Sequence, residues 1–373
     1  MESITLRFAA RCEAAGRDYN EDNFLLDDNL NDDTWGFRTD EVVPLEGKGA
    51  LLVVCDGMGG MNAGEVASAI AVDTIKKWFT HDKLTPSVID SPKSIQRYIY
   101  DAIQAADAAI KADSKNNPEH EGMGTTIVLT WLINGKIYVG WCGDSRAYRF
   151  NPDNGLERLS HDHSYVQELV DAGKLSEDLA IVHPNSNIIT RSLGDPRGKA
   201  IPEVQEYELY KNDVILLCSD GLCGTLRDSE IEYVLRQPYN TLQSYRDELW
   251  KADELAGWHD NVTILLAQVD GDAPAYPTNA SFKPTHSAEL RATNNRLKII
   301  IALLIAIIVL GLIGLFCFLC QPKQVLEPQP QEVLVVEPVE PQVHEPSVEE
   351  PFAEDDSAVV EEIELSDVST PCR

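Results

Sequence analysis

The chain has 373 residues, enough for one large domain or two ordinary ones, and its hydrophobic content of 43% is normal for a globular protein. Its formal net charge of -30 repels phosphate backbones and argues against nucleic acid as a partner. The eight cysteines lack paired spacing, which predicts reduced thiols rather than a disulfide framework.

The first 272 residues contain strand-like runs rich in Val, Ile, Leu and Thr, separated by turns. The Asn134-Gly135 dipeptide stands between two of these runs and predicts a β-hairpin, so at least part of the sheet is antiparallel. The predicted strands are 50–55, 125–133, 136–142, 213–218 and 261–269.

Helical spacing of apolar residues appears between the strands. Over 63–79, apolar side chains such as Ala67 and Ile75 fall on one face, and 91–112 and 241–255 look similar. These patterns predict helices that cover the outer faces of packed sheets.

Beyond residue 272 the composition changes three times. Residues 273–296 are polar and contain proline, as in a linker. The 22 residues of 299–320 carry no charge, and about 33 Å of helix is long enough to cross a bilayer, so we predict a transmembrane helix over 297–320 rather than a buried core helix. Residues 321–373 hold eight prolines, 14 acids and 2 basic residues, which predicts a disordered acidic tail.

Flanking charge orients this span. Four basic residues precede it closely, whereas only Lys323 follows it closely. By the positive-inside rule we expect a single-pass cell-membrane protein with a cytoplasmic N-terminal domain and an extracytoplasmic tail. The preceding basic residues are Lys283, Arg291, Arg296 and Lys298.

Acidic residues recur at the ends of the predicted strands. A single Asp-Gly after a strand is commonly only a turn, so a set of unconnected turns is one interpretation. If these acids instead gather at one sheet edge, they repel one another unless cations neutralise them, and an all-oxygen cluster suits magnesium or manganese. The acids are Glu21, Asp22, Asp56, Asp144, Asp220 and Asp260.

Such a cluster suits phosphoryl chemistry. Two metal ions about 3.5–4 Å apart share a water, lower its pKa and hold a phosphoryl oxygen. The resulting hydroxide attacks phosphorus in line with the leaving oxygen. An arginine is still needed to grip the phosphate in a bidentate way, and Arg17, four residues before Glu21, is well placed.

Eight ordered motifs resemble those of bacterial type 2C (PPM-type) metal-dependent protein Ser/Thr phosphatases. The resemblance spans residues 5–270, and no single motif would be specific alone. It implies an α+β fold, a four-layer α-β-β-α sandwich of two antiparallel sheets flanked by helices. The motifs are RDYNED, DGMGGMNAGEVAS, GMGTTIV, GDSRAYRF, DHSYVQELVDAGKLSEDLA, HPNSNIITRSLGD, LLCSDGL and HDNVTILL.

The resemblance also implies a role for each matching position. Asp56 bridges two divalent cations, manganese or magnesium, and the Gly57 carbonyl is a ligand. Asp220 and Asp260 complete one metal site. Glu21 and Asp22 face the site, with Asp22 acting through water. Asp144 joins Asp220 at a weaker third metal, and Arg17 binds the phosphate. Residues from about 160 to 195 match a variable flap that helps choose substrates.

The chain departs from the family at two points. Some members carry a histidine, cast as general acid, where this chain has Met58 or Met61; His161 and His163 near the flap are weaker alternatives. Gly224 stands where some relatives have another acid, which leaves the third metal site with fewer ligands.

The function implied is hydrolysis of phosphoserine and phosphothreonine in proteins, with a membrane-bound Ser/Thr kinase as one candidate partner. A cysteine phosphatase is excluded because no arginine follows a cysteine by six residues in the catalytic region. The remaining alternative is a membrane-anchored pseudophosphatase that binds phosphoproteins or scaffolds without turnover, but the complete set of costly carboxylates argues against it.

Overall fold

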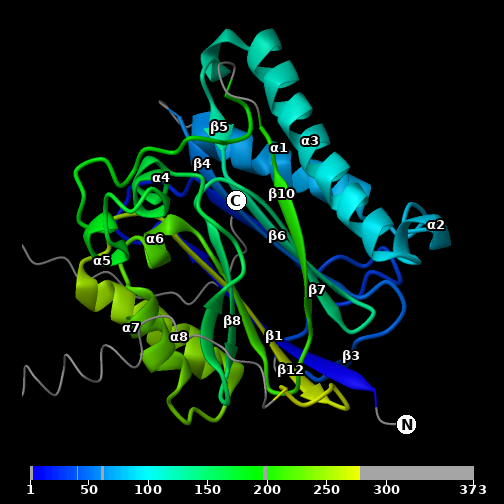
Figure 1. Ribbon diagram of the computed structural model, residues 1–373. Coiled ribbons are helices and arrows are strands. Elements are labelled where there is room, and N and C mark those ends of the chain that lie inside the picture. Colours follow the sequence, from blue (N-terminus) through cyan, green and yellow to red (C-terminus); the bar gives the residue numbers. More distant parts are fainter. Residues whose placement is uncertain (1–2, 40, 60–62, 196–199, 278–373) are drawn as a thin grey trace, which may run out of the picture. The chain divides into compact units, whose positions relative to one another are not determined.

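Two antiparallel sheets lie face to face and carry helices on their outer faces (Figure 1). This is the predicted four-layer arrangement. The computed structural model describes residues 3–39, 41–59, 63–195 and 200–277, which belong to one compact unit. In that part of the chain no helix is both long and apolar enough to cross a bilayer. The predicted span over 297–320 and the tail lie outside the described residues.

The first sheet runs in the order β3-β1-β12-β11-β8-β9, and all its pairings are antiparallel. The chain's first strand therefore pairs with the last strand of the domain, Ile4 opposite Gly271 and Glu13 opposite Val262. The strands are β1 Ile4–Glu13, β3 Val43–Pro44, β8 Arg146–Asn151, β9 Gly155–Arg158, β11 Val214–Cys218 and β12 Val262–Gly271.

The second sheet runs in the order β10-β7-β6-β4-β2, and a short strand, β5, pairs with the end of β4. The predicted hairpin joins β6 to β7, with Asn134 and Gly135 at φ of 55° and 71°, as a tight two-residue turn requires. The strands are β2 Asp22–Asp27, β4 Ala50–Met58, β5 Gly124–Thr125, β6 Ile127–Ile133, β7 Lys136–Cys142 and β10 Glu203–Glu208.

The three predicted helices are confirmed as α1, α3 and α8. Helix α3 begins where Ser91 accepts a hydrogen bond from the Ser94 amide and Pro92 occupies the first turn. Sequence reasoning did not place the shorter helices. The helices are α1 Ala63–Trp78, α2 Pro86–Ile89, α3 Pro92–Asn116, α4 Tyr165–Asp171, α5 Glu177–Ala180, α6 Asp220–Cys223, α7 Asp228–Leu235, α8 Leu242–Ala256 and the 3₁₀ turn Pro118–His120.

Three apolar layers hold the sandwich together. One, which includes Trp131, lies between the second sheet and helices α1 and α3. A second fills the space between the sheets, and a third, which includes Trp250, lies under helices α7 and α8. Because both faces of the central strands are covered, β4, β6 and β11 read as continuous apolar runs rather than alternating ones.

Candidate metal and phosphate site

Strand ends from both sheets bring the predicted acids together. Asp22 begins β2 and pairs in register with Asp56 near the end of β4. Asp220 follows β11 as the first residue of α6, and Asp260 stands two residues before β12. Asp144 lies in the turn between β7 and β8. The structure thus favours a cluster over unconnected turns.

Asp22 connects the two sheets. Its Oδ2 accepts hydrogen bonds from the Ser219 hydroxyl at 2.6 Å and the Thr263 hydroxyl at 2.7 Å, and both donors belong to the opposite sheet's strand ends. Its Oδ1 is buried and has no hydrogen-bond partner among the described residues. Burial, reinforced by the charges of Asp220 and Asp260, raises the pKa of Asp22 to about 7.

Asp56 and Asp220 form a carboxylate pair. Burial, and then the charges of Asp220 and Asp22, raise the pKa of Asp56 well above its ordinary value, and the Asp56 and Asp220 side chains hydrogen-bond to each other. Burial also raises the pKa of Asp220. Two buried carboxyl groups in contact share a proton unless a cation replaces it.

The backbone of Asp56 is held at both of its polar atoms. Its carbonyl accepts the Thr126 amide and the Thr125 hydroxyl, each at 2.8 Å, and its amide donates to the Thr126 hydroxyl at 3.1 Å. The same Thr126 hydroxyl lies 2.7 Å from the Ser145 hydroxyl. Since Ser145 follows Asp144, Thr126 ties the positions of Asp56 and Asp144 together.

Asp144 is buried, with 7% of its surface exposed, and its Oδ1 has no hydrogen-bond partner in the described part of the chain. Burial raises the pKa of Asp144 well above its ordinary value, with further contributions from Asp220 and Asp162. Asp144 therefore faces the same group of carboxylates.

Glu21 and two glycines make a close approach between β4 and α1. The Glu21 carbonyl accepts the Gly57 amide at 3.2 Å and the Ser68 hydroxyl at 2.7 Å. A Cβ on Gly64 would lie 2.6 Å from Glu21 Oε1, and one on Gly57 would lie 2.2 Å from the Gly64 carbonyl oxygen. Burial raises the pKa of Glu21. The Asp-Gly motif is therefore required by packing as well as by any ligand role.

Arg17 lies among these acids. Its Nη2 is 2.7 Å from Asp260 Oδ2, and its Nε donates to the His259 carbonyl at 3.1 Å. The Arg17 side chain is 54% exposed, so the guanidinium is open to solvent at the edge of the carboxylate cluster.

The donor set fits hard divalent cations. In the described ranges, no three His, Cys, Asp or Glu side chains are already grouped as metal ligands. Two buried carboxylate oxygens, on Asp22 and Asp144, nevertheless lack partners among the described residues. Oxygen atoms that are buried, mutually repelling and unpartnered are those that a magnesium or manganese ion satisfies.

Neither histidine near the flap lies free to protonate a leaving group. His161 Nε2 is 2.8 Å from Asp171 Oδ2. His163 is buried and its two ring nitrogens contact Gly143 and Glu203. Among the two candidate positions for the family histidine, Met58 ends β4, and residue 61 lies outside the described residues.

Sequence reasoning missed the groups that position the acids. Thr126, Ser219, Asn261 and Thr263 all hydrogen-bond to the acids or their backbones. A usable signal existed, since each is a polar residue within or beside a buried apolar run.

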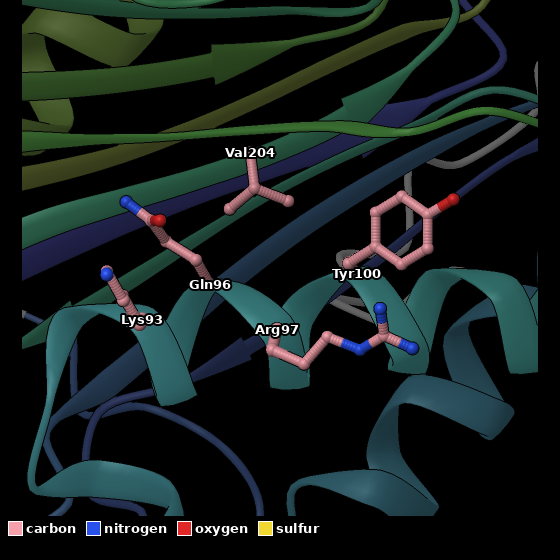
Figure 2. A pocket seen from close by; sticks show the side chains of 5 residues that line it. All are labelled: Lys93, Gln96, Arg97, Tyr100 and Val204. Carbon is pink, nitrogen blue, oxygen red and sulfur yellow. The ribbon is translucent and has the colours of Figure 1, made fainter.

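A separate hollow of about 340 Å³ between α3 and β10 contains none of the acids and is lined by Lys93, Gln96, Arg97, Tyr100 and Val204 (Figure 2).

Comparisons agree with this geometry. The protein phosphatase 2C family model matches residues 8–248. The serine/threonine phosphatase stp of Listeria monocytogenes is 33% identical over 220 residues, 59% of this chain and 84% of the relative. The serine/threonine phosphatase Stp1 of Staphylococcus aureus is 31% identical with a TM-score of 0.60, covering 71% of this chain and 96% of that structure.

A third relative was solved with metal. The catalytic domain of the serine/threonine protein phosphatase PstP in complex with two manganese ions is 29% identical to this chain, with a TM-score of 0.57. The likeness covers 72% of this chain and all of that structure.

Proposed function

The chain belongs to the protein phosphatase 2C family and is a protein serine/threonine phosphatase, and we propose how its own residues carry out the reaction. The observation that carries the proposal is the convergence of buried, mutually repelling carboxylates from both sheets beside an exposed arginine. Two divalent cations, manganese or magnesium, would supply an activated water as nucleophile and neutralise the phosphoryl oxygens.

We assign the first two cations to the acids at the centre of the cluster. Asp56 would bridge them, since it contacts Asp220 and lies opposite Asp22 in the register of β2 and β4. The Gly57 carbonyl, Asp220 and Asp260 would complete the direct ligands. Glu21 and Asp22 border the same space, and the unpartnered Asp22 Oδ1 would hold an ion through water, while its Oδ2 stays bonded to two hydroxyl donors.

A third and weaker cation site would lie between Asp144 and Asp220. Its support is the unpartnered Asp144 Oδ1 and the charge interaction between the two carboxyl groups. Gly224, at the end of α6, offers no side-chain ligand there, so fewer protein oxygens hold this ion.

Arg17 would hold the substrate's phosphate. Its guanidinium already lies against a carboxylate and is more than half exposed, so it is open to an incoming anion while Asp260 keeps it oriented. A planar guanidinium binds two phosphate oxygens at once, which orients phosphorus toward the nucleophile.

The test is hydrolysis of p-nitrophenyl phosphate and of a phosphothreonine peptide, with and without manganese. Asp56→Ala and Asp220→Ala should each lower turnover by several orders of magnitude, because each removes both metal and nucleophile. Asp101→Asn replaces a partly exposed acid on α3 that pairs with Arg97, and as the matched control its turnover should be unchanged. Near-normal activity in either alanine variant would refute the assignment.

The same assay separates the alternative function. A pseudophosphatase would bind the phosphothreonine peptide without hydrolysing it at any manganese concentration. Hydrolysis by the unaltered protein, abolished in Asp56→Ala, would exclude that alternative.

We also propose that residues 297–320 anchor the enzyme in the cell membrane with the phosphatase domain in the cytoplasm. The support is the uncharged run of 22 residues and the excess of basic residues on its N-terminal side. Its substrates would then be cytosolic phosphoproteins, among them a membrane-bound Ser/Thr kinase. Protease added to spheroplasts should clip the acidic tail and spare the phosphatase domain; cleavage of the domain with protection of the tail would overturn the orientation.

A further inference from the structure

His163 lies near the start of the segment 160–195, where it contacts the turn that carries Asp144. It is 4% exposed, and its ring stacks against Trp141 with the centroids 6.3 Å apart and the planes 21° from parallel. A buried histidine that only filled space would need no polar partners, but every polar atom of this residue is engaged.

One side of His163 holds the turn that carries Asp144. The Gly143 amide donates to His163 Nδ1 at 3.2 Å, and the His163 amide donates back to the Gly143 carbonyl at 2.9 Å. Gly143 has φ of 126°, and a Cβ there would lie 2.6 Å from the Thr126 side chain. The turn is therefore fixed between His163 on one side and Thr126, which also holds Asp56, on the other.

The other side of His163 holds the returning half of the same segment. His163 Nε2 lies 3.1 Å from Glu203 Oε1, and Arg191 Nη1 donates to the same oxygen at 2.9 Å. The His163 carbonyl accepts the Thr190 amide at 2.8 Å. Both ends of the segment 160–195 are therefore held at His163, and the His163 ring is in turn bonded to Glu203 of β10.

The hydrogen bonds define the state of the ring. Because the Gly143 amide donates to Nδ1, that nitrogen carries no proton, and Nε2 carries the proton that it donates to Glu203. Burial lowers the pKa of His163, which favours this neutral form.

We infer that His163 is a positioning residue with two separable roles: Nδ1 fixes the Gly143 turn and hence Asp144, and Nε2 with Glu203 fixes the segment 160–195 against which a phosphoprotein rests. The inference rests on the proposed role of Asp144 as a metal ligand. Leu193, near the end of the segment, pairs with Thr125, whose hydroxyl binds the Asp56 carbonyl, so the segment borders the carboxylate cluster and a bound peptide would extend toward it. A small aryl phosphate would not extend that far.

Two amide substitutions divide the roles. In His163→Asn, the amide oxygen takes the place of Nδ1 and still accepts the hydrogen bond from the Gly143 amide. The shorter side chain no longer reaches Glu203, so that hydrogen bond is lost. In His163→Gln, the longer side chain reaches toward Glu203 and loses the acceptor for Gly143. Glu203→Gln, at a half-exposed position, weakens the second role while His163 itself stays unchanged. His161→Asn, two residues away and exposed, is the matched control.

The measurements are the manganese concentration for half-maximal activity and the KM for p-nitrophenyl phosphate and for a phosphothreonine peptide, all on the full chain in detergent. His163→Gln should raise the half-maximal manganese concentration about tenfold, the equivalent of one net hydrogen bond. His163→Asn and Glu203→Gln should leave it within about twofold but raise the peptide KM several-fold without changing the aryl phosphate KM.

Two results would overturn the inference. One is that His163→Asn and His163→Gln shift the same constants equally, which would make the residue merely structural. The other is that Glu203→Gln leaves the peptide KM unchanged. Failure of the proposed function is distinguishable, since the unaltered protein would then show no manganese-dependent hydrolysis at all.

Discussion

Asp253 offers a test of the fold that is independent of the chemistry. It lies in α8 beneath the first sheet, is fully buried, and neither of its carboxylate oxygens has a hydrogen-bond partner in the described part of the chain. Burial raises the pKa of Asp253 to about 7, and the nearby Thr225 hydroxyl only partly opposes this. In the unfolded chain the same carboxyl group titrates near 3.9.

The sign of the pH dependence follows from these two values. Between them the folded protein holds a proton that the unfolded chain releases, so the free energy of unfolding falls as the pH rises through this window. For this one group the loss between pH 5 and pH 8 is about 2–3 kcal/mol. Asp253→Asn cannot ionise, so the variant should gain that much stability relative to the unaltered protein over the same range.

Denaturant unfolding at both pH values, followed by tryptophan fluorescence, measures the effect. All six tryptophans lie between residues 35 and 258, so the signal reports the phosphatase domain. The difference in unfolding free energy between the variant and the unaltered protein, taken at each pH, cancels the contributions of the other acids. Glu254→Gln, at the next and exposed residue of α8, is the control and should show no such gain. A stability difference for Asp253→Asn that is equal at pH 5 and pH 8 would refute the reasoning.

Three further predictions concern the site. Arg17→Ala should lower kcat/KM by the equivalent of about 1–3 kcal/mol, as expected for a lost charge-assisted pair, and leave the manganese requirement unchanged; a large shift in that requirement would contradict a phosphate role. Gly64→Ala should lower the unfolding midpoint, because its Cβ would lie 2.6 Å from Glu21 Oε1, and an unchanged midpoint would contradict the packing. Manganese should raise the unfolding midpoint and chelation reverse it, because cations relieve repulsion among the acids; indifference to manganese would count against the site.

The sequence was most informative where the pattern was local. The Asn134-Gly135 hairpin and the long amphipathic helices depend on neighbours in the chain, and the structure confirms them. Strand β1 was not predicted, although its residues alternate partly in burial, because its place is fixed by pairing with β12 across the whole length of the domain. Long-range pairing leaves little trace in a short window of sequence.

The site, too, combines features that the sequence predicts with features that only the structure shows. The acids could be predicted because charged residues at the ends of apolar runs are conspicuous and because their motifs are specific when taken together. Their supports could not be ranked, since a hydroxyl such as Thr263 looks like an ordinary strand residue until Asp22 is placed beside it. The roles of the individual acids stay predictions until the variants are measured.

The two sheets must meet in one relative position for the carboxylates to act together. Asp22 and Asp56 come from the second sheet, whereas Asp220 and Asp260 follow or precede strands of the first. Ser219 and Thr263 of the first sheet's strand ends bond directly to the Asp22 side chain of the second. Asp22 therefore does more than border the cluster. One of its oxygens joins the two sheets, and the other has no hydrogen-bond partner among the described residues. A substitution such as Asp22→Asn, which retains one acceptor oxygen, should preserve the inter-sheet bonds better than it preserves metal binding, whereas Asp22→Ala should impair both.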